Sequence, residues 1–146
     1  MKKIGILTFH CAHNYGAVLQ TYATQRLLED AGHDVEVIDY RPVSLTAPYK
    51  RVRLSRLKGK NGGLSIRHLV SEFLLFPYRC IRYHAFRRFI NYRLSLSERV
   101  TRESFEGNYD VIVVGSDQVW NPEMTGGALD RMYLADFAFE KGKRRY

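Results

Sequence analysis

Short apolar runs and one amphipathic segment alternate along the first forty residues. Residues 3–9 are rich in β-forming side chains and predict a strand, and residues 34–40 alternate valine with polar residues and predict another. Between them, residues 16–31 carry apolar side chains at helical spacing, and Gly32 follows where a helix commonly ends. A strand–helix–strand unit of this length favours two parallel strands with a right-handed crossover.

A third apolar run, residues 111–114, has the length and the unbroken Val/Ile composition of a strand that is buried on both faces. It stops at Gly115, where polar and turn-forming residues begin. Open α/β sheets bind ligands just beyond the carboxyl ends of their strands, so a site is expected there. The order of elements predicts an α/β domain, a Rossmann-like doubly wound sheet with three parallel strands.

The middle of the chain differs from this pattern. Residues 41–63 contain turn residues and seven Lys/Arg, and residues 64–92 are helix-like, with a break expected near Pro77. The second half of that segment places one apolar stripe on a helix, formed by Ile81, Ala85, Phe86, Phe89 and Ile90. The predicted organisation is one N-terminal Rossmann-like domain over residues 1–146, with a basic helical insert at about 41–104 and the C-terminal domain absent.

Charge is concentrated in the same region. The chain has a net charge of +8, and residues 50–106 hold 14 Lys/Arg against 4 Glu. This surplus suits an anionic partner, and peripheral contact with an anionic membrane surface is one expectation. The interleaved aromatic residues are expected on the buried sides of helices, and without a recognised motif nucleic-acid binding is not predicted. Two cysteines without a framework, and no apolar run of about 20 residues, predict a cytoplasmic protein, at most peripheral at the inner face of the membrane.

Candidate chemistry falls in two loops that follow strands. In the first, His10 and His13 are candidate general bases, because histidine titrates near neutral pH. Asn14, Tyr15 and Gly16 then open a helix whose N–H groups suit a phosphate, a carboxylate or sugar hydroxyls. The alternatives are that the histidines make ordinary loop hydrogen bonds and that Asn14 only caps the helix.

The second loop follows residue 114. Asp117 is a candidate base or hydroxyl-orienting group, and Trp120, the only tryptophan, either stacks on a sugar ring or belongs to the core. The remaining candidate substrate-binding residues are Gly115, Ser116, Gln118 and Asn121. No dinucleotide or P-loop fingerprint occurs, and His10, Cys11 and His13 lack companions at metal-ligand spacing, so neither a cofactor nor a metal is predicted.

Four segments together resemble the N-terminal part of the polysaccharide pyruvyl transferase family. They are residues 5–10 (GILTFH), 14–20 (NYGAVLQ), 37–40 (VIDY) and 109–122 (YDVIVVGSDQVWNP). The resemblance implies a two-domain architecture similar to GT-B glycosyltransferases, with the active site between the domains. It also implies transfer of pyruvate, as a ketal, from phosphoenolpyruvate to a pair of sugar hydroxyls during cell-surface polysaccharide synthesis.

The implied partners are a sugar or polysaccharide-repeat acceptor and a downstream chain that supplies the C-terminal domain, because chains of the family are more than twice this long. Phosphoenolpyruvate is then the donor substrate. Two alternatives stay open: the N-terminal domain of a GT-B-type glycosyltransferase that uses a nucleotide sugar, and a catalytically inactive fragment or basic adaptor.

Overall fold

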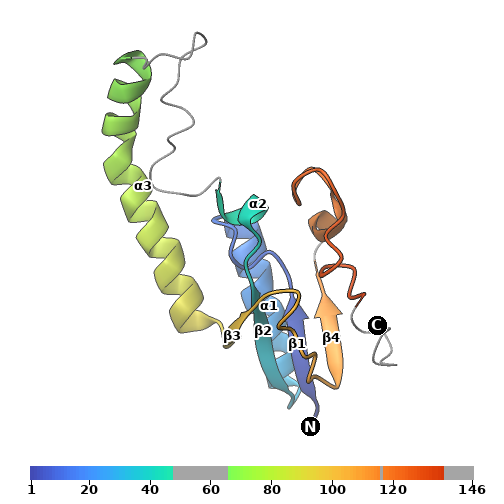
Figure 1. The fold of residues 1–146 in the computed structure, drawn as a ribbon. Helices are drawn as coiled ribbons and strands as arrows, with labels where there is room; N and C mark the ends of the chain where they lie inside the picture. The colour runs from blue at the N-terminus through green and yellow to red at the C-terminus, as the bar shows by residue number, and fades with distance from the viewer. Residues whose placement is uncertain (48–65, 116, 137–146) are drawn as a thin grey trace.

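The computed structural model describes residues 1–47, 66–115 and 117–136, apart from the side chains of residues 66–69, 71, 72 and 117. Figure 1 shows the elements in chain order: β1 (Lys3–Leu7), α1 (Tyr15–Asp30), β2 (Asp34–Tyr40), α2 (Val43–Thr46), α3 (Ile66–Arg93), β3 (Leu96–Val100), β4 (Val111–Val114) and a short 3-10 helix, η3 (Asp117–Trp120). The predicted first, second and last strands are all present. The helix predicted over residues 16–31 is α1, and Gly32 follows it in the left-handed conformation, with φ of 83°.

The strands form one sheet in the order β3-β2-β1-β4, and every pair is parallel. This is a Rossmann-like α/β fold, as predicted. The prediction of three strands is wrong, because the described sheet has four. The strand that the sequence pattern missed, β3, lies inside the predicted insert and pairs only with β2. Its centre is polar (Ser97, Glu98, Arg99), since an edge strand needs fewer apolar side chains.

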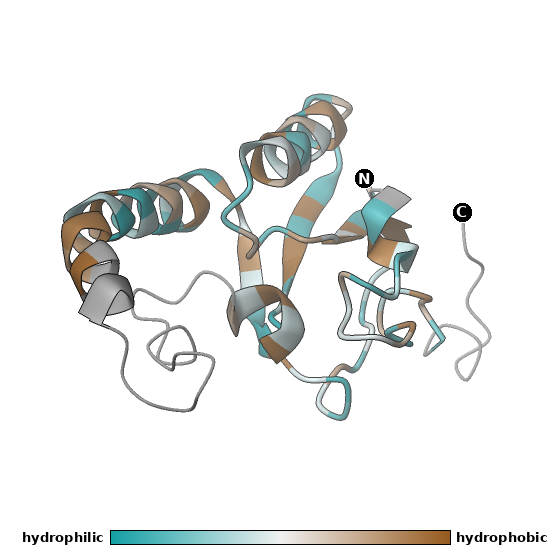
Figure 2. Ribbon diagram, turned by 90° about the horizontal axis from the view of Figure 1, so that it is seen from above, coloured by the Kyte–Doolittle hydropathy of each residue, from teal (hydrophilic) through white to brown (hydrophobic). Residues whose placement is uncertain are grey.

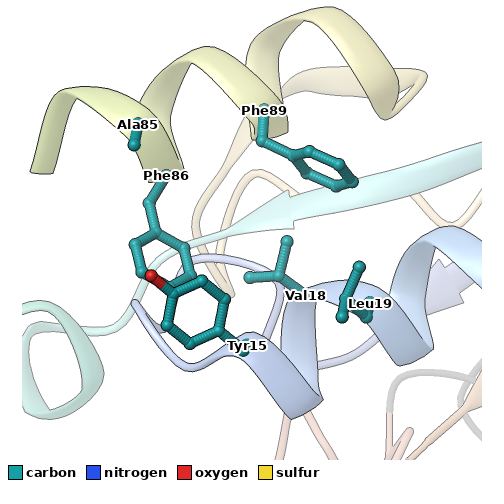
Figure 3. A pocket seen from close by; sticks show the side chains of 6 residues that line it. All are labelled: Tyr15, Val18, Leu19, Ala85, Phe86 and Phe89. Carbon is teal, nitrogen blue, oxygen red and sulfur yellow. The ribbon is translucent and has the colours of Figure 1, made fainter. Parts of the chain in front are cut away.

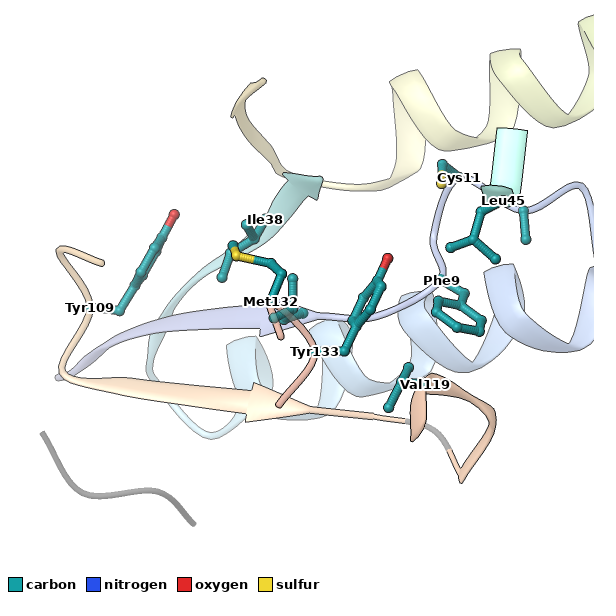
Figure 4. Packing of buried hydrophobic residues seen from close by; sticks show 10 residues of the cluster. Phe9, Cys11, Ile38, Leu45, Tyr109, Val119, Met132 and Tyr133 are labelled. Carbon is teal, nitrogen blue, oxygen red and sulfur yellow. The ribbon is translucent and has the colours of Figure 1, made fainter. Parts of the chain in front are cut away.

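Successive strand residues point to opposite sides of the sheet. Each side is covered by its own apolar cluster. Figure 2, the view from above, places α1 on one side of the sheet and α2 on the other. On the α1 side one apolar cluster joins Ile6, Val18, Val35, Val37, Phe86, Ile90 and Leu94. The other cluster, drawn in Figure 4, includes Leu7, Phe9, Cys11, Ile38, Leu45, Tyr109, Val119, Met132 and Tyr133. Residues 130–133 therefore close the second face.

A close approach at Gly5 joins the central strand to the second cluster. A Cβ atom there would lie 2.9 Å from Ile38 Cδ1 and 3.0 Å from two ring carbons of Tyr109. Only glycine leaves room for the Tyr109 ring to lie against the sheet. The hydroxyl of that tyrosine donates to Glu36 Oε2 on β2 at 2.9 Å, so one ring spans two strands.

The β4 strand is less buried than its composition predicts. All four residues of Val111–Val114 are half-buried, which corrects the prediction of a strand covered on both faces. The physical reason is position: β4 pairs with β1 alone and forms an edge of the described sheet. An unbroken Val/Ile run does not by itself distinguish a central strand from an edge strand.

Helix α3 continues through Pro77, so the predicted break is wrong. Proline removes one backbone donor, and around Phe73 and Pro77 the helix is exposed to water that can satisfy the freed carbonyl group. The predicted apolar stripe also divides: Phe86 and Ile90 are buried against α1 and the sheet, whereas Ile81 is 71% exposed. The expectation that the helix buries its aromatic residues is therefore wrong for Tyr92, which is 81% exposed, and for the half of α3 that lies far from the sheet. There the exposed side chains are Val70, Phe73, Leu74, Leu75, Phe76, Tyr78 and Ile81.

Candidate functional site

The parallel sheet brings four loops to one edge. The segments that follow β1, β2, β3 and β4 all leave from the carboxyl ends of their strands, and Figure 1 shows the β1, β2 and β4 loops rising from the same side. This is the edge at which open α/β sheets bind ligands. The two predicted site loops therefore lie on the same side of the sheet, together with two further loops that sequence reasoning did not consider.

His10 is buried below this edge. It is fully excluded from solvent, with Nε2 at 2.9 Å from Asp39 Oδ1 and Nδ1 at 3.3 Å from the carbonyl oxygen of Thr8. Asp39, at the end of β2, also accepts a hydrogen bond from Nε of Arg41. Burial raises the pKa of Asp39, but the hydrogen bonds from His10 and Arg41 and the Arg41 charge outweigh it and bring the pKa to about 2. The carboxylate thus stays ionised and links the ends of β1 and β2.

The tip of the loop after β1 packs against α3. The His13 ring stacks on Phe86 with centroids 5.2 Å apart, and Arg82 Nη2 donates to the His13 carbonyl oxygen at 2.7 Å. Burial, with the charges of Arg82 and Arg41, lowers the pKa of His13, so its imidazole is neutral at neutral pH. Tyr15 next to it is 68% exposed. In this loop His13 is therefore half-buried, whereas Asn14 and Tyr15 are exposed.

Asn14 caps α1. Its Oδ1 atom accepts hydrogen bonds from the backbone N–H groups of Gly16 at 2.8 Å and Ala17 at 3.4 Å. A Cβ atom at Gly16 would lie 3.3 Å from the same oxygen, so a glycine keeps the cap uncrowded. Asn14 is therefore the N-cap of α1.

Among the described side chains of the β4 loop, Gln118 and Trp120 are exposed and Asn121 is half-buried. Gly115 continues the strand pairing by donating to the Leu7 carbonyl oxygen at 3.2 Å, and Val119 is buried as the anchor of η3. Trp120 is 55% exposed and donates from Nε1 to the Tyr133 carbonyl oxygen at 3.2 Å, so the core alternative for it is wrong. Asn121 Nδ2 donates to Gln118 Oε1 at 3.2 Å. Ser116 and the Asp117 side chain, both predicted to contribute, lie outside the described residues.

A basic pocket at the ends of β2 and β3 escaped prediction. It has a volume of about 460 Å³, and its wall includes four arginines, Arg41, Arg99, Arg102 and Arg131. We call it the arginine pocket. The Tyr40 hydroxyl on its wall donates to Asp130 Oδ2 at 2.8 Å. Burial and this carboxylate raise the pKa of Tyr40. The sequence pattern does not reveal the pocket, because it places Arg99 and Arg102 in a basic insert and does not predict β3.

Two buried groups near this edge, the Cys11 thiol and the Tyr133 hydroxyl, have raised pKa values. Burial raises the pKa of the Cys11 thiol to about 11, so it is not a thiolate nucleophile at neutral pH. Burial also raises the pKa of Tyr133, whose hydroxyl has no hydrogen-bond partner among the described residues. The second cysteine, Cys80, is half-buried.

A second pocket is apolar and lies between α1 and α3. It has a volume of about 200 Å³ and is lined by Tyr15, Val18, Leu19, Ala85, Phe86 and Phe89, which Figure 3 shows converging from the two helices. Tyr15 belongs both to this groove and to the β1 loop. Within residues 1–47, 66–115 and 117–136, no three His, Cys, Asp or Glu side chains gather as a metal site would need, and no helix is long and apolar enough to span a bilayer.

Comparison with known protein families identifies the family of this chain. The family model of the polysaccharide pyruvyl transferases matches residues 14–146, nearly the whole chain. The chain therefore belongs to the polysaccharide pyruvyl transferase family, in agreement with the resemblance carried by its motifs. No curated protein and no solved structure gives a significant match.

Proposed function

We propose that this protein takes part in transferring pyruvate, as a ketal, from phosphoenolpyruvate to two hydroxyls of a sugar in cell-surface polysaccharide synthesis. The family supports a polysaccharide acceptor. The observation that carries the proposal is the shared edge: β1, whose loop leads into the NYG segment at residues 14–16, and β4, which leads into Gly115, are parallel and end at the same edge of the sheet.

The reaction defines what the site must supply. One sugar hydroxyl adds to C2 of the enol while a proton is delivered to C3, which becomes the methyl group. The second hydroxyl then displaces phosphate from C2, and the products are the ketal and inorganic phosphate. A base is needed for the hydroxyls, an acid for the enol carbon, and cations for the carboxylate and the phosphate.

We assign the base to His13 or Asp117, and to His10 a positioning role. His13 is a neutral imidazole at the loop tip, which can accept a proton from a hydroxyl. His10 is fully buried with both ring nitrogens directed at protein oxygens, so it acts through Asp39 and Arg41 rather than on substrate.

The sugar acceptor is proposed to lie on the β4 loop. Trp120 exposes more than half of its surface, and the indole face is suited to stacking on a sugar ring. The amides of Gln118 and Asn121 and the backbone at Gly115 and Gly16 offer donors and acceptors for hydroxyls. A second domain, supplied by a downstream chain, is proposed to close over this edge and to provide further cations for the donor.

The test is ketal formation by this chain together with a chain that carries the second domain. Phosphoenolpyruvate and a panel of hexose and N-acetylhexosamine acceptors are supplied, and phosphate release and the ketal methyl group are followed by NMR. Trp120→Ala and His13→Ala are expected to lower kcat/KM by at least about tenfold, whereas Arg26→Gln on the exposed face of α1 leaves it unchanged. Absence of the ketal with every acceptor would contradict the proposal.

The GT-B-type glycosyltransferase remains the competing function, because it shares the Rossmann-like half. Isothermal titration separates the two. Binding of a nucleotide sugar without binding of phosphoenolpyruvate favours the glycosyltransferase. An assembly that binds neither, and forms no ketal, favours the inactive fragment or basic adaptor.

We also propose that the protein works in the cytoplasm, where phosphoenolpyruvate is made, in peripheral contact with an anionic membrane. The far half of α3 exposes Val70, Phe73, Leu74, Tyr78 and Ile81, which recur every three or four residues and so share one side of the helix. Figure 2 shows this hydrophobic end at the greatest distance from the sheet. The helix carries six arginines and one glutamate, a composition that suits anionic headgroups.

Cosedimentation with vesicles tests this contact. The chain is expected to sediment with phosphatidylcholine vesicles that contain phosphatidylglycerol and to remain in solution with phosphatidylcholine alone. Phe73→Ser with Ile81→Ser is expected to abolish the binding. The matched control, Leu27→Ser, removes an exposed leucine from α1 and is expected to bind normally. Binding that ignores lipid charge, or that the control loses equally, contradicts the proposal.

A further inference from the structure

The arginine pocket is placed where a ligand of this fold would be expected. Its wall comes from the carboxyl ends of β2 and β3, at Arg41 and Arg99–Arg102, and from Leu129–Arg131 of the segment that closes the second face. Its volume of about 460 Å³ lies within the range of pockets that hold small organic ligands. One inorganic ion would leave most of that space to water.

The charges on the wall favour an anion. The wall carries four arginines and only two acidic residues, Glu103 and Asp130. The Asp130 carboxylate already accepts hydrogen bonds from the Tyr40 hydroxyl at 2.8 Å and from the Met132 backbone N–H at 2.9 Å. Arginine presents five N–H donors in a planar fork that matches phosphate and carboxylate oxygens.

The four arginines are not equivalent. Arg41 is held by Asp39, itself fixed by the buried His10, and Arg131 is paired with the carboxylate of Asp136 at 2.5 Å. Arg99 and Arg102 form no ion pair or guanidinium hydrogen bond within the described part of the chain. The pocket therefore has two arginines fixed by protein carboxylates and two whose donors face solvent.

We propose that the arginine pocket binds the phosphate group of a small organic phosphate, with Arg99 and Arg102 as its principal ligands. Arg41, held by Asp39, orients the bound anion, and Arg131 is a further cation on the pocket wall. Two ligands of the proposed reaction present this chemistry: the donor phosphoenolpyruvate, and an acceptor sugar that carries a phosphate or diphosphate. This choice of sources rests on the proposed function, but anion binding itself does not.

Calorimetric titration at low ionic strength tests the pocket with three probes: inorganic phosphate, phosphoenolpyruvate and a sugar nucleoside diphosphate. An organic phosphate is expected to bind more tightly than inorganic phosphate, and the affinity is expected to fall as salt is added. Phosphoenolpyruvate as the tighter probe identifies a donor site, and the sugar diphosphate as the tighter probe identifies an acceptor site. Equal and weak binding of all three overturns the proposal.

Paired variants separate a built site from general attraction to a basic protein. Arg99→Gln with Arg102→Gln is expected to weaken organic phosphate binding roughly 100-fold. The control, Lys2→Gln with Arg26→Gln, removes the same charge from exposed positions outside the pocket and is expected to leave the affinity within about twofold. Equal weakening by both pairs overturns the site. Thermal unfolding of both variants checks that the exposed substitutions leave the fold intact.

The experiments can reject phosphate binding at the arginine pocket without rejecting the proposed pyruvyl transfer, and the reverse. Phosphate binding that depends on Arg99 and Arg102, in a protein that forms no ketal, keeps the pocket and removes the pyruvyl transfer. Ketal formation with an unchanged KM for both substrates in the Arg99→Gln, Arg102→Gln variant keeps the transfer and removes the pocket.

Discussion

The two loops that the sequence marks as chemical differ in how the fold uses them. The loop after β1 turns inward: His10, Cys11 and Ala12 are buried, and Asn14 is committed to capping α1. The loop after β4 turns outward, with Val119 as its buried anchor and Trp120 mostly exposed. The difference teaches that polar residues at the carboxyl edge of a sheet serve two purposes, since some hold neighbouring strands together and others stay exposed to solvent.

Asp39→Ala is expected to have the largest effect on stability. It removes the carboxylate that faces buried His10 and Arg41, and leaving partners of a buried charged pair unmatched costs about 3 kcal/mol. The free energy of unfolding in urea measures the loss. Asp30→Ala, at the exposed end of α1, serves as the control and should change it by less than about 0.5 kcal/mol. A small effect of Asp39→Ala on the free energy of unfolding would contradict the inference that the β1 loop, through His10 and Asp39, holds neighbouring strands together.

The same carboxylate predicts an acid-sensitive fold. The pKa of Asp39 in the folded protein, about 2, lies below its value in the unfolded chain, so its contribution is present at neutral pH. That contribution decreases as the pH falls below about 4 toward 2. Urea midpoints of the wild-type and Asp39→Asn proteins should converge over this interval, and parallel curves would contradict the assignment.

Val119→Ala tests the buried anchor of the β4 loop. The side chain is 1% exposed, and losing two buried methyl groups with their contacts costs about 2 kcal/mol. Its neighbour supplies the control, because Trp120→Ala removes a largely exposed ring and should change stability by less than about 1 kcal/mol while abolishing acceptor binding. The two variants compared by thermal unfolding separate anchoring from recognition within one loop.

Asn14→Ala is expected to have the smallest effect. It removes the side-chain oxygen that receives two N–H groups at the start of α1, a loss of about 1 kcal/mol. Gln20→Ala, exposed on the same helix, is the control and should be nearly neutral. If Asn14→Ala leaves the urea midpoint unchanged but weakens sugar binding, Asn14 belongs with the ligand-facing residues instead.

The central part of the fold follows from local pattern. β2 and β4 have the bounds that their Val/Ile content predicts, and α1 begins at an Asx cap and ends before Gly32. β3 could not be recognised, because Ser97, Glu98 and Arg99 interrupt its apolar positions and only pairing with β2 makes it a strand. The path of α3 through Pro77 was also hidden, since proline lowers helix stability without deciding whether exposed backbone is satisfied by water.

The sequence predicts each of the two loops of the candidate site, but it does not predict the arginine pocket. Trp120 and His13 lie at the expected edge because parallel strands end together. The carboxylate at Asp39 and the arginine pocket depend on contacts between residues far apart in sequence, such as His10 with Asp39 and Tyr40 with Asp130. Such pairings depend on the register between strands and on the path of residues 129–131, and neither leaves a local sequence pattern.

The strand order has a consequence for how the molecule assembles. The two inner strands, β1 and β2, lie within the first forty residues with α1 between them, whereas the outer strands β3 and β4 come later in the chain. During synthesis the inner pair leaves the ribosome first, and its contacts are the more local ones. We therefore expect the sheet to grow from its middle outward, with each later strand adding to an edge that has already folded.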